Sequence, residues 1–239
     1  MPKTGILIAG SLYWNWSDRP HRVQWRKDHL RQGSEIAVDV PIRYGRLSSE
    51  GSYTMVFAPA CPLGRAKIIE CQHSNNTIDD VIREAQALWL AESRDGSPRQ
   101  PTLASNWGCV ALLANPASAL PRSLFDAWAE RVAEERYSRG KVRCYDSQAY
   151  AVQGRAAISD GGLLQIAWPV FASTGAAVDS FDLLLATATK PTPDANTRDY
   201  PNAERIAAAW RSTSNPQYFL ENRKHGFHTF QDDEIIKYL

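Results

Sequence analysis

Short apolar runs dominate the first third of the chain, and their lengths predict strands. Residues 6–9 form a continuous apolar run closed by Gly10 and Ser11, a pattern typical of a buried strand that ends in a tight turn. Residues 35–41 alternate instead, with aliphatic side chains on one face. We expect further strands at 52–58, 65–71 and 107–113, which carry β-branched, aromatic or aliphatic residues.

Helical periodicity begins after residue 77. Thr77 is a suitable N-cap, and Asp79 and Asp80 follow it in the first turn, where acidic side chains are favourable. The apolar positions then recur every three or four residues, which predicts a helix that ends at about Glu92 or Ser93. A second helix should start at Pro121, and shorter helices are expected at 203–212 and 232–239.

The order of these elements favours an α+β fold over a regularly alternating α/β sheet. The remaining strands are expected near 142–145, 150–153 and 163–170, whereas the apolar run 181–187 fits either a strand or a helix. The segment 190–201 is rich in proline and polar residues and predicts a linker or long loop. We therefore expect an α+β domain over residues 1–189 and a helical extension over 190–239 packed on it, with a single domain as the alternative.

Composition narrows the classes of function. The 27 Lys and Arg nearly balance the 26 Asp and Glu, giving a formal net charge of +1, which argues against a general polyanion binder. The apolar runs are too short for a signal peptide or a membrane span, so we expect a soluble, cytoplasmic protein. None of the four cysteines forms a CxxC pair, which predicts buried thiols.

One motif points to a particular chemistry. Gly10-Ser11-Leu12-Tyr13-Trp14-Asn15 directly follows the first predicted strand, where a glycine lets backbone amides approach a ligand closely. This strand-Gly-Ser-Leu-x-Trp sequence resembles the opening of the γ-glutamylcyclotransferase superfamily, particularly its ChaC-like branch. The resemblance extends loosely over residues 5–113, through an arginine-rich segment, two strands and an acidic helix that ends in Glu92. It implies a mixed, barrel-like sheet with flanking helices.

The resemblance also implies a reaction and a set of residues. The substrate would be a small γ-glutamyl amine or peptide, whose own α-amine attacks its γ-carbonyl to give 5-oxoproline and a free amine, without a cofactor. Such a reaction needs a carboxylate to carry the proton, for which Glu92 is the first choice and Glu84 the second. The backbone of Gly10, Ser11 and Leu12 would bind the glutamyl end. The substrate carboxylate would then meet an arginine, either Arg43 or Arg46.

Other constellations give alternatives. The eight tryptophans, with the arginines of residues 19–31, could instead form the aromatic and basic surface of a non-catalytic protein- or nucleic-acid-binding module, although the charge balance disfavours nucleic acid. His225 and His228 lack a third ligand at a recognised spacing, and His73 lies two residues after Cys71, which is only a weak hint of a metal or nucleophile. We therefore predict no metal site from the sequence. The oligomeric state is not indicated.

Overall fold

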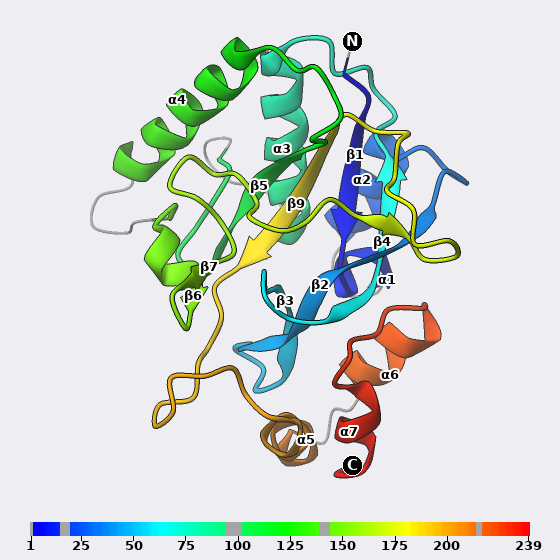
Figure 1. The fold of residues 1–239 in the computed structure, drawn as a ribbon, viewed down its shortest axis with the longest axis vertical. Helices are drawn as coiled ribbons and strands as arrows, with labels where there is room; N and C mark the ends of the chain where they lie inside the picture. Colours follow the sequence, from blue (N-terminus) through cyan, green and yellow to red (C-terminus); the bar gives the residue numbers. More distant parts are fainter. Residues whose placement is uncertain (1, 15–19, 94–101, 139–143, 214–216) are drawn as a thin grey trace.

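A seven-stranded mixed sheet with helices around it forms the main body of the protein (Figure 1). The computed structural model describes residues 2–14, 20–93, 102–138, 144–213 and 217–239. The main sheet has the strand order β3-β2-β4-β1-β9-β5, and the short β8, off this path, pairs with Val38 and Asp39 of β2. Its strands are β1 (Thr4–Ile8), β2 (Ile36–Leu47), β3 (Tyr53–Phe57), β4 (Leu63–Glu70), β5 (Gly108–Ala114), β8 (Val170–Phe171) and β9 (Leu183–Thr189).

The centre of the sheet is a parallel pair within an otherwise antiparallel arrangement. β1 runs parallel to β9, with Ile6 opposite Leu185, whereas β4 and β5 flank this pair in antiparallel register. All five residues of β1 are buried. Most of the apolar run at 181–187 belongs to the strand β9. The sequence left this run open between helix and strand, because a strand that is buried on both faces shows no alternation of apolar and polar residues.

The sheet is open rather than a closed barrel. β2 pairs with β4 through its first half and with β3 through its second half, so that β3 comes near β9 without pairing with it. Within the described residues no ladder joins β3 to β5, the two ends of the order. The expected α+β class with a mixed sheet is confirmed, and the expected barrel-like closure is wrong.

Seven helices surround the sheet in the described part of the chain. They are α1 (Ser11–Trp14), α2 (Pro20–His29), α3 (Ile78–Glu92), α4 (Arg122–Ser138), α5 (Ala203–Ser212), α6 (Gln217–Lys224) and α7 (Asp232–Ile236). The helix α3 begins as expected, because Thr77 and Asp80 form a reciprocal capping box, and it packs beside α2 on one face of the sheet (Figure 1). None of the described helices has the length and apolar character needed to span a membrane.

The segment between α4 and β9 differs most from expectation. Cys144 and Tyr145 form a turn instead of a strand, and residues 142 and 143 lie outside the described residues. The expected strands at 150–153 and 163–170 shrink to the small hairpin of β6 (Ala151–Val152) and β7 (Arg155–Ala156), isolated bridges and β8. This segment buries Tyr145 against the edge of β5, where its hydroxyl donates to the Val110 carbonyl at 2.6 Å. The apolar side chains of this segment are therefore buried by packing, and not by pairing in a strand ladder as the sequence predicted.

The last fifty residues complete the core at the end of the sheet where β1 and β9 terminate (Figure 1). Tyr44 of β2 makes an edge contact with Trp210 of α5, with ring centroids 5.0 Å apart, and Trp210 lies 4.9 Å from Phe219 of α6. All three side chains are fully or almost fully buried. The Gln231 side chain accepts from the Tyr44 amide at 2.9 Å, which satisfies a backbone donor that β3 does not reach.

This shared core predicts how the chain unfolds. We expect Trp210→Ala to lower the free energy of unfolding by about 3–5 kcal/mol, because it empties a fully buried site between two rings. Leu220→Ala, at a half-exposed position of the next helix, should change it by less than about 1 kcal/mol. Urea unfolding followed by far-UV circular dichroism measures both. Two separate transitions, with only one sensitive to Trp210→Ala, would show that 190–239 unfolds independently.

Candidate functional site

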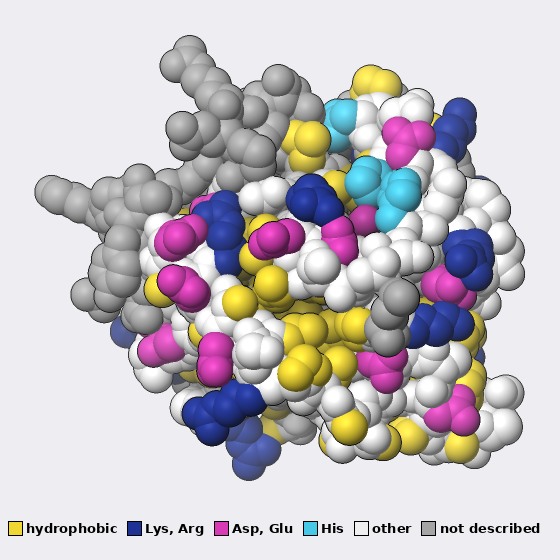
Figure 2. Space-filling model, turned by 90° about the horizontal axis from the view of Figure 1, so that it is seen from above, with side chains coloured by type: hydrophobic (Ala, Val, Ile, Leu, Met, Phe, Trp, Pro, Cys, Tyr) yellow, Lys and Arg dark blue, Asp and Glu magenta, His cyan; other side chains and the backbone are white. Residues whose placement is uncertain are grey.

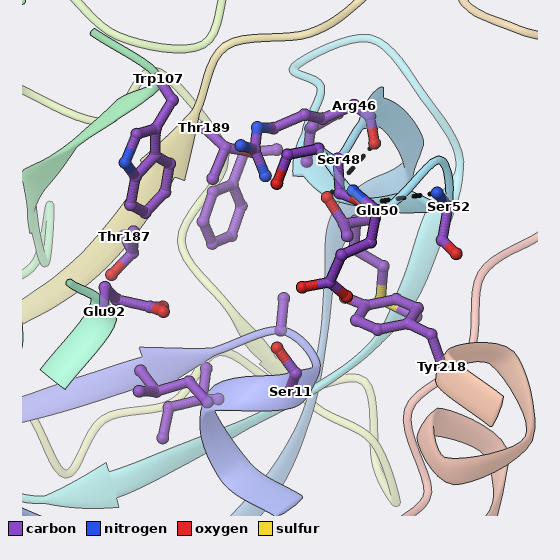
Figure 3. A pocket seen from close by; sticks show the side chains of 18 of the residues that line it. Ser11, Arg46, Ser48, Glu50, Ser52, Glu92, Trp107, Thr187, Thr189 and Tyr218 are labelled. Atoms are coloured by element: carbon purple, nitrogen blue, oxygen red, sulfur yellow. Dashed lines mark hydrogen bonds between the residues drawn. The ribbon is translucent and has the colours of Figure 1, made fainter. Parts of the chain in front are cut away.

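A cavity of about 670 Å³ lies at the end of the sheet where β1 and β9 terminate. Its walls come from that end of β1, from α1, from β3 and the turn before it, from the last residue of α3 and from the start of α6. Figure 3 shows the side chains of Ser11, Glu50 and Glu92 directed into the same space. The cavity thus collects polar groups from segments that are far apart in the sequence.

Arg22 of α2 ties two of these walls together. Its guanidinium donates through Nη1 to the Ser11 carbonyl at 3.2 Å, through Nε to the Ala91 carbonyl at 3.2 Å and through Nη2 to Glu92 Oε2 at 2.6 Å. The Arg22 side chain is 2% exposed and that of Glu92 is 14% exposed. One guanidinium group therefore fixes the Glu92 carboxylate beside the turn that follows β1.

A second buried arginine supports the same turn. Arg26, one helical turn after Arg22, donates through Nη1 to the Leu12 carbonyl. The pKa of Arg26 is lowered to about 10, mainly because burial desolvates its charge and secondly because Arg22 is also positive. The negative charge of Glu92 opposes both effects. Glu92 thus balances charge on two buried guanidinium groups, which gives its position at the end of α3 a structural reason.

The opposite wall carries a third arginine. Arg46 of β2 lies over the Trp107 ring, with Cζ 5.0 Å from the ring centroid. Burial lowers the pKa of Arg46 and the charge of Glu92 raises it, so the two groups interact across the cavity. The hydroxyls of Thr187 and Thr189 at the end of β9 are buried and meet no hydrogen-bond partner among the described residues. Such groups suit a small polar ligand that carries both charge and hydrogen-bonding atoms.

The helix α6 closes the cavity on one side. Trp14 donates to Asn222 Oδ1 at 2.7 Å, and its ring contacts Tyr218 edge-on at 5.7 Å. Gly10 has a φ of +108°, and a Cβ built there would lie 2.6 Å from the Tyr218 hydroxyl. Burial raises the pKa of Tyr218, whose hydroxyl interacts with Asn222 and the Met55 backbone. Glycine is therefore required at position 10 both for its backbone conformation and for contact with α6.

The structure brings most of the sequence-predicted site residues together. Ser11, Leu12, Arg46 and Glu92 all line the cavity, and Gly10 lies between the lining residues Ala9 and Ser11. Asn15 of the motif lies outside the described residues.

Two predicted residues lie elsewhere. The Oε2 atom of the buried Glu84 accepts from His29 Nδ1 at 3.0 Å, away from the cavity lining. Arg43 stacks on Tyr200 and donates to the Pro201 carbonyl at 3.3 Å. Arg46 lines the cavity and Arg43 does not, and a register shift of β2 lies between them, between Tyr44 and Arg46.

The lining residues that were not assigned to the site by sequence include Arg22, Glu50, Trp107 and Tyr218. Arg22 belongs to the arginine-rich segment, but nothing in that segment distinguishes an inward arginine from a solvated one. Tyr218 reaches Gly10 from more than two hundred positions away, so no local pattern could have placed it.

The contact between Gly10 and Tyr218 leads to a stability prediction. Gly10→Ala should cost about 1–3 kcal/mol, because it combines a left-handed backbone with a steric overlap. Gly33→Ala is the matched control: its φ is +77° but its Cβ would meet nothing within 4 Å, so it should cost about 1 kcal/mol. In a Tyr218→Phe background, Gly10→Ala should be less costly than in the wild type. Equal costs for Gly10→Ala and Gly33→Ala in urea unfolding would contradict this geometry.

No protein-family model, no curated protein and no solved structure matches the chain. The cavity itself must therefore carry the argument for function.

Proposed function

We propose that the chain is a γ-glutamylcyclotransferase-like enzyme, which converts a γ-glutamyl amine or peptide into 5-oxoproline and a free amine. One observation carries the proposal: the Glu92 carboxylate and the Ser11-Leu12 turn, both selected from sequence, face one cavity and are bridged by one guanidinium. The resemblance in sequence joins the same two segments. A carboxylate beside polar backbone at the wall of a cavity is what the reaction requires.

The reaction rearranges one substrate molecule. The α-amino nitrogen attacks the γ-carbonyl carbon, a C–N bond closes the five-membered ring, and the C–N bond to the leaving amine breaks. The attacking nitrogen loses a proton and the leaving nitrogen gains one, so no external reactant is consumed. Glu92 is the group that would accept the first proton and return it to the leaving amine. The cavity contributes by holding the substrate folded, because the intramolecular attack depends on proximity.

The remaining groups of the cavity would bind the substrate. The backbone amides of Ser11 and Leu12 would donate to the γ-carbonyl oxygen as it becomes negative. Arg46 would pair with the α-carboxylate, and its stacking on Trp107 holds the guanidinium in place for that contact. The unpartnered Thr187 hydroxyl at the end of β9 offers a further hydrogen bond to the glutamyl part.

The alternative, a non-catalytic binding module, predicts a broad exposed aromatic or basic surface with the carboxylates in solvent. Among the residues that the structure describes, no tryptophan is exposed and Glu92 is largely enclosed. These observations support the enzyme.

We expect Glu92→Gln to reduce 5-oxoproline release by at least about 100-fold, since it removes the group that carries the proton. Because Glu92 also pairs with Arg22, this variant should unfold at a lower temperature, and the assay must run below that transition. Glu92→Asp keeps the charge and should retain more activity than Glu92→Gln. The matched control is Glu134→Gln on an exposed side of α4, which should leave turnover unchanged.

The assay compares γ-glutamyl amines and peptides with analogues acetylated at the α-amine. The proposed mechanism requires the free α-amine, so the acetylated analogues should yield no 5-oxoproline. Release of glutamate in place of 5-oxoproline would indicate a hydrolase. Absence of product from every γ-glutamyl substrate, or full activity of Glu92→Gln, would overturn the proposal.

A further inference from the structure

A cluster of metal-ligating side chains lies outside the cavity, where the end of α2 meets the second turn of α3. His29 is the last residue of α2, His73 follows β4, and Glu84 lies on α3. Each offers one ligand atom, and these three atoms lie within 4.8 Å of one another. Figure 2 shows histidine side chains gathered on this end of the molecule, beside acidic side chains.

The backbone holds the three elements in this arrangement. The Gln72 amide donates to the His29 carbonyl at 2.8 Å, and Leu30 bridges Cys71 in antiparallel fashion, so the end of α2 is paired with the segment that carries His73. The helices α2 and α3 pack on each other along their lengths. The cluster is thus set by the fold and does not depend on long surface side chains.

The Glu84 carboxylate is the second observation that points to a ligand. The residue is 4% exposed, and one oxygen, Oε2, lies 3.0 Å from His29 Nδ1. The other oxygen, Oε1, is buried and has no hydrogen-bond partner among the described residues. A buried carboxylate oxygen without a donor is costly, and a cation at the cluster would remove that cost. The ring centroids of His29 and His73 lie 5.4 Å apart with an interplanar angle of 72°, so the two imidazoles meet edge to face beside this carboxylate.

We propose that His29, His73 and Glu84 form a binding site for a single divalent transition-metal ion of the Zn²⁺ type. Two imidazole nitrogens and one carboxylate oxygen are a donor set that suits Zn²⁺, whereas Mg²⁺ and Ca²⁺ prefer oxygen ligands alone. His73 is exposed, so the fourth position of a tetrahedral ion faces solvent and can hold water.

This site is distinct from the proposed catalytic cavity. None of the three residues lines the cavity, and Glu84 precedes Glu92 by eight positions of α3, about 12 Å along the helix axis. The ion would join α2, α3 and the segment after β4. Arg22 joins the other ends of the same two helices, α2 and α3. It would therefore stabilise the folded chain by binding only to it.

The test measures Zn²⁺ binding and not catalysis. The full-length chain is stripped with a chelator, desalted and titrated with Zn²⁺ in competition with a chromogenic zinc indicator. We expect one tight equivalent and a higher Tm with Zn²⁺ but not with Mg²⁺. Co²⁺ should give the intense visible absorption of a tetrahedral complex.

Variants decide whether the cluster holds the ion. His73→Ala removes an exposed ligand with little risk to folding, and it should weaken Zn²⁺ binding by at least about tenfold. Glu84→Gln should do the same and should reduce the Co²⁺ absorption. His228→Ala, an exposed histidine outside the cluster, is the matched control and should bind Zn²⁺ as the wild type does. Absence of stoichiometric binding, or equal affinity in His73→Ala and the wild type, would overturn the proposal, whatever the outcome of the activity assay.

Discussion

The arrangement of the site depends on the hydrogen bonds that the Arg22 guanidinium makes. It is buried, and its three hydrogen bonds to Ser11, Ala91 and Glu92 reach the turn after β1 and the end of α3, two segments that no strand ladder connects. A buried guanidinium is tolerated only when its donors and its charge are satisfied together. Glu92 supplies the charge, and the Ser11 and Ala91 carbonyls supply acceptors. The position of α3 relative to β1 is thereby fixed at the place where the cavity forms.

The same constraint gathers polar groups at one end of the sheet. The parallel pair of β1 and β9 ends at a wall where arginines, a glutamate and threonine hydroxyls collect, whereas the strands themselves pack into an aliphatic and aromatic core. The helix α6 closes the cavity through Tyr218, and the aromatic cluster around Tyr44 packs α5 and α6 against β2. A site of this kind is assembled from both ends of the chain, since Gln217 and Tyr218 of the C-terminal segment are part of its wall.

The sequence predicted helices well where only one face of the helix is buried and that face is apolar. Helix α3, with its Thr77 cap, and helix α5 at Ala203–Ser212 lie where the periodicity placed them. Helix α2 was missed because its inward face carries Arg22 and Arg26, so charged residues interrupt the apolar stripe that marks a buried helix face. For the site, the motif at residues 10–12 and Glu92 could be selected from sequence. Arg43 could not be separated from Arg46, because their surroundings come from distant segments, Tyr200 and Pro201 at Arg43 and Trp107 at Arg46.

A double-mutant cycle of Arg22→Met and Glu92→Gln tests this central contact most directly, with urea unfolding as the measurement. Arg22→Met should cost about 3–5 kcal/mol, because it leaves the carboxylate and two carbonyls without their shared donor. Glu92→Gln should cost clearly less in the Arg22→Met background than in the wild type, with a coupling free energy of about 1–3 kcal/mol. Costs that add within about 0.5 kcal/mol would contradict the account, since they would show that Arg22 does not hold Glu92 in place.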